Sequence, residues 1–329
     1  MNKKLLGLAV AAVFASGTAV AGEVYSSDAA TVSLSGEVKA SGSHIRASGK
    51  KADGTALDAD KNLAVGTSAK LSVSATHQLN DAVELGASFD IKDDSDVFQD
   101  VKVFGSGDFG KLTLGATGNS FGAVEKAGAG EGSNIYAVSQ GSPGENGVRY
   151  EKSFDDVAFS ANYATNSDVK NSDSAYAASL AYSADTFSAA VAYGTDGDSA
   201  TSVGVAGDVT FGDVKVGATY IDFENAGKVA VNDIDTETSL GALGDNEGKS
   251  YGVGLTYTLG DASLFASAQK VDFDKSALGK VEVSTFYAGA TYSVSSNFSV
   301  FGFYQDGEVK ASSNKGDATA ITLGAKFTF

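Results

Sequence analysis

The chain has 329 residues, a formal net charge of −17 at pH 7, no cysteine, and a single proline beside 40 glycines. This acidity argues against nucleic acid as a partner, and the absence of cysteine excludes a disulfide framework. Apolar residues make up 43% and aromatic residues 10%, too much for an acidic disordered chain. Proline is excluded from ladder positions in sheets, so its near-absence favours a chain built mostly of strands.

The first segment, residues 1–21, is predicted to be a cleaved secretory signal. Residues 2–4 read NKK, residues 5–15 form an apolar run too short to span a bilayer as a helix, and residues 19–21 read AVA. The signal carries two lysines and no acid, so the formal charge of the mature chain falls from −17 to −19. After it, no apolar run is long enough for a membrane helix.

The mature chain consists of segments in which apolar and polar residues alternate with a period of two, the pattern of half-buried strands. Examples are residues 32–40 (VSLSGEVKA), 83–91 (VELGASFDI) and 321–329 (ITLGAKFTF). The second face of these segments is small or charged. The last segment ends the chain on Phe329, where a water-soluble domain would more often fray.

Two kinds of connection alternate between these segments. Short turns are predicted at Asn80-Asp81, Gly107-Asp108, Asp155-Asp156, Ala184-Asp185, Gly212-Asp213, Gly260-Asp261 and Ser296-Asn297. Longer polar loops are predicted at 47–63, 93–96, 118–145, 165–172, 195–200, 224–248, 273–280 and 306–317. Seven turns and eight loops make fifteen connections, which join sixteen strands.

An even strand count, with short turns at one end and long loops at the other, is the layout of outer-membrane barrels. A sheet in hydrocarbon must close on itself, because no backbone group can stay unpaired there. We therefore predict an all-β fold for residues 22–329: a sixteen-stranded antiparallel transmembrane β-barrel with short periplasmic turns and long extracellular loops. Apolar side chains would face lipid, polar ones would line the lumen, and the last strand would pair with the first. Aromatic girdle positions are predicted at Phe211, Tyr257, Phe298, Phe327 and Phe329.

The mature start, residues 22–40, resembles the first strand of the trimeric general porins of Gram-negative bacteria. The matching residues are Glu23, Val24, Tyr25, Asp28, Leu34 and Gly36. Residues 112–125 are similar to the family's fifth strand running into its long third loop, and residues 146–163 to the strand pair after that loop. The C-terminal aromatic residue matches the family's assembly signal. In layout the resemblance covers the whole mature chain.

The resemblance implies a homotrimer of barrels in the outer membrane, surrounded by outer-membrane lipid and lipopolysaccharide. It also implies recognition of Phe329 by the barrel-assembly machinery. Residues 118–145 would be the third loop, folded into the water-filled pore so that its acids face basic residues of the opposite wall. The pore-constriction residues implied by position are Lys39, Lys70, Glu125, Glu131 and Arg149. GAGEGSN (128–134) replaces the family's acidic P-E-F-G-G stretch, and Glu37 replaces a basic residue of its first strand.

The sequence supports no catalytic, cofactor-binding or metal-binding site. His44 and His77 are the two histidines, and we expect them near opposite rims of the barrel, too far apart for a shared site. Residues 58–69 begin like a calcium-binding loop but lack its glycine at position six and its glutamate at position twelve. We therefore expect no enzyme.

The predicted function is passive diffusion of small hydrophilic solutes and ions across the outer membrane. A mild cation preference is expected from the mature charge of −19. One alternative is a substrate-selective porin, for example for oligosaccharides, which would need aromatic side chains in the lumen. Most strand aromatics have lipid-facing parity, with Phe98, Phe104 and a few in 286–303 ambiguous. The sequence is also compatible with a surface adhesin or receptor that uses long loops such as 224–248 and, with least support, with an outer-membrane hydrolase.

Overall fold

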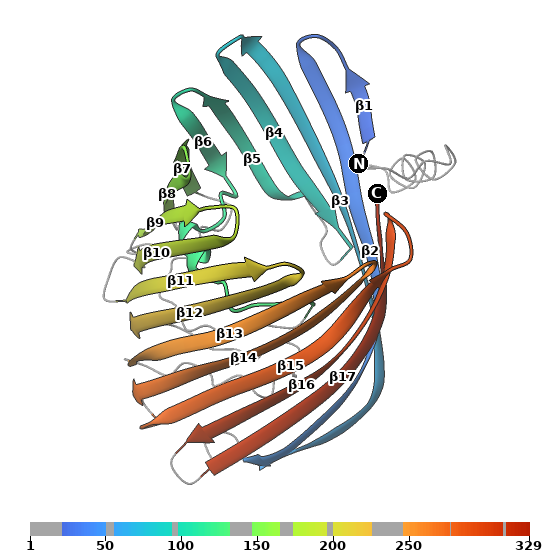
Figure 1. The fold of residues 1–329 in the computed structure, drawn as a ribbon, viewed down its shortest axis with the longest axis vertical. Helices are drawn as coiled ribbons and strands as arrows, with labels where there is room; N and C mark the ends of the chain where they lie inside the picture. Colours follow the sequence, from blue (N-terminus) through green and yellow to red (C-terminus); the bar gives the residue numbers. More distant parts are fainter. Residues whose placement is uncertain are drawn as a thin grey trace.

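A computed structural model describes residues 22–50, 56–93, 98–131, 147–164, 174–195, 200–225, 246–276, 278–311 and 314–329. Within them, the strands β2 to β17 form one closed antiparallel sheet in which each strand pairs with its neighbours in sequence (Figure 1). The ring closes because the last strand, β17, pairs with β2. The predicted sixteen-stranded barrel is therefore confirmed. No helix in the described part of the chain is long and apolar enough to cross a membrane.

The elements run in chain order as β1 (Gly22–Ser26), β2 (Ala30–Lys50), β3 (Ala56–Asn80), β4 (Val83–Lys92), β5 (Phe98–Gly107), β6 (Gly110–Gly115), the 3-10 helix η1 (Ser120–Val124), β7 (Gly147–Phe154), β8 (Val157–Ala164), β9 (Ala175–Ser183), β10 (Phe187–Thr195), β11 (Thr201–Phe211), β12 (Val214–Glu224), β13 (Glu247–Leu259), β14 (Ala262–Lys275), β15 (Val281–Ser293), β16 (Phe298–Ala311) and β17 (Asn314–Thr328).

All seven predicted short turns join consecutive strands at one end of the barrel, which we call the turn end. The opposite loop end carries the longer connections, but three predicted loops are shorter than expected. Most of 47–63 and 306–317 belongs to strands, as does the beginning of 273–280. Backbone pairing explains the difference, because Ser48 pairs with Asp58 and Lys310 with Lys315, although their side chains are polar. Polarity marked these segments as loops, whereas hydrogen bonding between neighbouring strands extends the sheet.

The two faces of the sheet have the predicted inside-out polarity. Leu85, Val191 and Leu323 are 43%, 52% and 66% exposed on the outer face. In a soluble β-sandwich such residues would be buried between two sheets. Serine, threonine and charged residues occupy the alternate, inward positions over much of the wall, as Ser72 and Asp90 do. The apolar face of this barrel is therefore its exterior.

Aromatic side chains border the outer apolar face at both ends. Phe211 and Phe298 lie near the turn end, and Phe298 pairs with Phe327 across β16 and β17. Exposed tyrosines form the other border, among them Tyr193, Tyr220 and Tyr304. These two rings are the girdles expected at the two membrane surfaces.

The C-terminus is fixed in the sheet by backbone hydrogen bonds. The backbone NH of Phe329 donates to the carbonyl oxygen of Gly36 over 3.0 Å, and the NH of Gly36 donates to Phe329 over 2.7 Å. Phe329 is buried rather than part of the exposed ring, with its ring 6.2 Å from that of Phe327. The extra strand β1 pairs with β2 from Thr31 to Leu34 and so continues the line of β17. The final residue therefore anchors the seam instead of fraying.

Candidate functional site

The segment after β6 lies inside the barrel against its inner wall. The NH of Ser120 donates to the Asn162 side chain of β8 over 2.7 Å. Further along, the NH of Lys126 donates to the Thr219 hydroxyl of β12 over 2.8 Å. The NH of Ala129 then donates to the Tyr287 hydroxyl of β15 over 2.9 Å. Residues 117–131, which we call the inner loop, thus follow the wall from β8 to β15.

A short helix begins this path. The side chain of Asn119 accepts a hydrogen bond from the NH of Phe121 over 2.8 Å and so caps η1. The helix turns Phe121 and Val124 toward the wall, where both are fully buried against Ile221 and Ala190. This apolar contact fixes the first half of the inner loop, since each buried side chain contributes about 1.5–3 kcal/mol.

Glycines in the wall make room for the second half of the inner loop. A side chain on Gly217 would overlap the carbonyl oxygen of Lys126, and one on Gly254 would overlap that of Ala127. Both glycines occupy inward-facing positions on the neighbouring strands β12 and β13. The backbone of the loop can therefore lie directly on the sheet, and the Ser267 hydroxyl donates to the carbonyl oxygen of Ala127 over 2.7 Å.

An inward aromatic cluster supports the inner loop near its tip. Phe265, Tyr287, Phe301 and Phe303 are all buried on the inner face of β14–β16, and Ala129 packs against them. The sequence predicts lipid-facing positions for most strand aromatics and leaves those in 286–303 ambiguous. Phe265 departs from this prediction, and Tyr287, Phe301 and Phe303 are the ambiguous residues that turn out to face inward. The alternation of apolar and polar residues is weak in these segments, because small residues such as Gly302 occupy the outward positions between the inward aromatic ones.

The tip of the inner loop is tied to the seam of the barrel by ion pairs. The carboxylate of Glu131 lies 2.6 Å from the Lys326 ammonium of β17 and 3.3 Å from the Lys39 ammonium of β2. Burial alone would raise the pKa of Glu131, but the hydrogen bond from Lys326 and the charges of both lysines lower it. Glu131 therefore stays ionised, and two of the predicted residues, Lys39 and Glu131, are in direct contact.

Glu125 lies on the same loop with its side chain exposed to the lumen. Enclosure by the surrounding barrel desolvates its carboxyl and raises its pKa. The exposed surface of the side chain and this desolvation are compatible, because the water it contacts is confined within protein. Glu125 is thus an acid in the passage that protonates more readily than one on an open surface.

The remaining predicted residues lie on the wall that the inner loop leaves uncovered. The Lys70 ammonium is 2.7 Å from the Asp90 carboxylate on the neighbouring strand β4. Arg149 on β7 pairs with Glu151 over 2.9 Å and donates to the carbonyl oxygen of Thr117 over 3.2 Å. Arg149 therefore holds the beginning of the inner loop, whereas Lys70 belongs to a strand-to-strand ion pair.

Several inward cations were missed in the sequence. Lys326 pairs with Glu131, Lys92 lies 2.9 Å from Asp100, and the Lys111 ammonium lies 4.3 Å from the centre of the Phe104 ring. Lys102 also has inward parity, since it pairs with Ser88. The alternation in ITLGAKFTF already places Lys326 on the polar face, so the signal was present for this residue. The inward cations named above thus lie on β17 and β2–β7. A further inward ion pair, Asp208 with Lys215, lies on β11 and β12, where Lys126 of the inner loop joins it.

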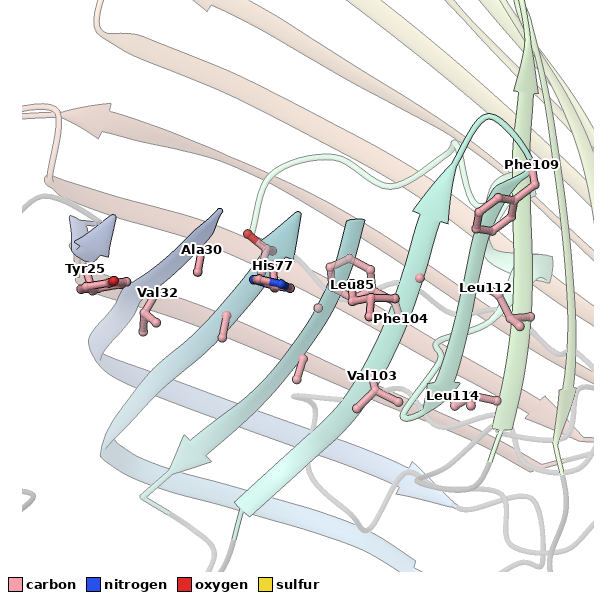
Figure 2. Close-up of a pocket in the computed structure, with 15 residues that line it drawn as sticks. Tyr25, Ala30, Val32, His77, Leu85, Val103, Phe104, Phe109, Leu112 and Leu114 are labelled. Carbon is pink, nitrogen blue, oxygen red and sulfur yellow. The ribbon is translucent and has the colours of Figure 1, made fainter. Parts of the chain in front are cut away.

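The outer face of β1–β6 carries an apolar groove of about 730 Å³. Figure 2 shows Val32, Leu85, Val103 and Leu114 along neighbouring strands of this groove. His77 lines it near the turn end, on the opposite face of β3 from Lys70. Within the described ranges, no three residues that could ligate a metal ion come together. His77 therefore belongs to the exterior and not to the passage.

Comparisons with known protein families and solved structures identify proteins that are similar to this chain. The sequence profile of the Gram-negative porins matches residues 7–312. No curated protein sequence matches the chain. Similar solved structures include OmpT of Vibrio cholerae in its trimer form (18% identity, 92% of this chain and 100% of that chain, TM-score 0.71). Two others are an anion-selective porin from Comamonas acidovorans (18%, 91% and 100%, 0.65) and OmpF of Salmonella typhi in complex with daunomycin (17%, 94% and 100%, 0.67).

Proposed function

Because the chain belongs to the Gram-negative porins and is an outer-membrane channel, we propose that it conducts small hydrophilic solutes and ions by passive diffusion. The observation that carries this proposal is the inner loop, held inside the barrel by contacts from Asn162 to Lys326. Such a loop narrows the passage without closing a catalytic site around a substrate. The channel on this account makes and breaks no bond and needs no cofactor.

The pore constriction is proposed to lie between the inner loop, with Glu125 and Glu131, and the wall carrying Lys39, Lys70 and Arg149. Four of these five side chains form ion pairs with opposite charges. Paired charges largely cancel at a distance, so the constriction itself discriminates weakly between cations and anions. Because the charges at the constriction are largely paired, the channel is expected to pass solutes of either charge.

A mild cation preference is proposed to come from the whole-protein field. The mature chain carries −19, and most of the charges close to the inner loop are neutralised by partners. A field of this origin acts at the mouths of the pore, where salt screens it with a Debye length of about 10 Å at 0.1 M.

Reversal potentials across a salt gradient test this preference. We expect a cation-selective potential at low salt that approaches zero as both solutions are raised toward 1 M. A potential of anionic sign at low salt would refute the preference, and one that persists at high salt would place its origin at the constriction.

The structure offers little to an oligosaccharide-selective channel. Four inward aromatic side chains, Phe265, Tyr287, Phe301 and Phe303, are buried beneath the inner loop. Phe104 also faces inward, and the Lys111 ammonium lies 4.3 Å from the centre of its ring. Sugar rings need exposed aromatic faces to stack upon. The long loop 224–248, proposed for an adhesin, lies outside the described residues apart from its ends.

The functional unit is proposed to be a homotrimer within outer-membrane lipid and lipopolysaccharide. The similar Vibrio cholerae protein was solved in a trimer form. Recognition of Phe329 by the barrel-assembly machinery is proposed from its position at the seam.

A further inference from the structure

The wall formed by β12, β14–β17 and β2 changes its polarity between the turn end and the loop end. On β16, Val300 and Tyr304 face outward in the lower part, and Glu308 and Lys310 take the same face further up. The inward face of β14 changes in the opposite sense, from Ser267 and Gln269 to the buried Val271 further up. On β16 the inward face is apolar lower down as well, at Phe301 and Phe303. The same exchange occurs on β15, where Glu282 faces outward between inward valines.

The outer face of this upper part is a network of ion pairs. Lys270 lies 2.7 Å from Asp272 and 3.2 Å from Glu282. Glu308 pairs with both Lys310 and Lys315, the latter over 2.7 Å. Charged side chains facing hydrocarbon cost several kcal/mol each near the bilayer centre, so this surface lies outside the apolar layer.

The lengths of the strands agree with that position. The strands β13–β17 have 13 to 15 residues, whereas β7–β12 have 8 to 11. A tilted strand needs only ~9–11 residues to cross a membrane. The surplus lies toward the loop end, where β16 continues from Tyr304 to Ala311.

The inner face of the same upper part is dry. Val271, Val281 and Val283 are 0% exposed, and the rings of Phe223 and Phe273 meet at 5.3 Å beside them. Ile45 and Leu278 pack against the edge of this cluster, which also includes Ala47 of β2 and Ala318 of β17. A water-filled mouth would wet these side chains, at a cost of roughly 25 cal/mol per Å² of apolar surface.

We propose that this upper wall stands above the outer leaflet as an extracellular sheet with a dry core, and that solutes enter along the opposite wall. The entrance then leads over β4–β7, where Lys102 and Arg149 lie, since β3 pairs with β2 as far as Ala56 and continues the tall wall. The inference rests on the proposed channel function and assigns the route that water and solutes take to the constriction. The observation that supports this proposal is the exchange of polarity between the two faces. A strand with a water-filled lumen on one side and lipid on the other would place polar residues inward and apolar residues outward, whereas here valines point inward and ion pairs point outward.

Single cysteines test the route directly, because the chain has none of its own. The variants are Val283→Cys on the dry face, Glu282→Cys on the adjacent outward position, and Lys102→Cys on the opposite wall. A small, charged, membrane-impermeant methanethiosulfonate is added to intact cells. We expect Glu282→Cys and Lys102→Cys to react readily and Val283→Cys to react about 100-fold more slowly, because it must await a local opening.

Equal reaction rates at Val283→Cys and Lys102→Cys would overturn the dry core, and an unreactive Glu282→Cys would overturn its position above the membrane. Val309→Cys replaces Val283→Cys if that variant fails to assemble. In planar bilayers, modification at Lys102→Cys should alter the single-channel conductance and exposure of Val309→Cys to the reagent should not; the reverse pattern contradicts the route. If the unmodified protein does not conduct at all, the proposed channel function fails instead.

Discussion

At the residue scale, the clearest contact is the one between Glu131 and the two lysines of the seam. Glu131 is about four-fifths buried as a side chain, and its partners Lys39 and Lys326 are largely covered as well. Lys39 also lies 5.0 Å from the centre of the Phe301 ring. Removing the carboxylate would leave two partly buried cations without their anion, which is more costly than losing an exposed pair.

Glu131→Gln should therefore release the tip of the inner loop. We expect noisier open-channel currents and a loss of about 1.5–3 kcal/mol in unfolding free energy, the range for hydrogen bonds to charged groups. Current recordings and denaturant unfolding in lipid vesicles measure these two effects. Asp317→Asn, which removes one negative charge from the outer face, is the control. Equal behaviour of the two variants would show that the tether has no influence on the loop.

Glu125 should give the channel a pH dependence. Its pKa is raised by desolvation, so on acidification it loses its negative charge before exposed glutamates do. Cation preference should then decline at weakly acidic pH, while Glu131, with its lowered pKa, stays ionised and keeps the loop in place. Reversal potentials recorded between about pH 7 and pH 4 measure the change. Glu125→Gln should remove this early step; an unchanged pH profile in that variant would assign the titration to another group.

At the scale of elements, the inner loop shows what alternation could and could not predict. Residues 118–145 interrupt the strand pattern and are predicted to form one loop, of which the structure describes 118–131. The seven short turns, each marked by a pair of residues that contains Asp or Asn, lie where the sequence predicts them. The sequence could not predict the path along the wall. That path depends on Gly217, Gly254 and Tyr287, which lie on strands far away in sequence and look ordinary within them.

The same limit applies to the ends of the strands. The described parts of 47–63 and 306–317 pair as regular strands. On β16 and β17 the outward residues Glu308, Lys310 and Lys315 form ion pairs and are polar because they meet water. Period-two patterns separate apolar from polar faces only where one face meets lipid. Where the outward face meets water and the inward face is buried, apolar residues point inward and polar residues point outward. The polar residues of such a segment then resemble those of a loop.

Gly254→Ala tests how closely the loop and the wall are packed. The added carbon would overlap the carbonyl oxygen of Ala127, so the inner loop must move toward the passage. We expect a lower single-channel conductance and a cost of about 1–3 kcal/mol in unfolding free energy, as for other overpacked sites. Gly66→Ala is the matched control, because nothing lies within 4 Å of a side chain there. Wild-type conductance in Gly254→Ala would mean that the loop does not rest on this glycine.

At the scale of the whole molecule, closure of the sheet organises everything else. The pairing of β17 with β2 brings Lys326 beside Lys39, and so builds the anchoring point for the inner loop at the seam itself. The loop then covers a wall whose inward charges, Asp208 and Lys215, pair with each other, and it leaves open the wall that carries Lys70 and Lys102. Because the inner loop lies against one side of the barrel, that side of the interior is packed and the other side is open to water. The dry upper wall continues the packed side beyond the membrane.

The central claim, a water-filled passage beside an anchored inner loop, is tested most directly by the conductance of the purified protein in planar lipid bilayers. We predict stepwise insertions that each add a fixed ohmic conductance, rising in proportion to salt concentration, with closures in threes under high voltage if the proposed trimer is correct. A protein that inserts and yet carries no current, or one whose current saturates at low salt as at a tight binding site, would contradict the account.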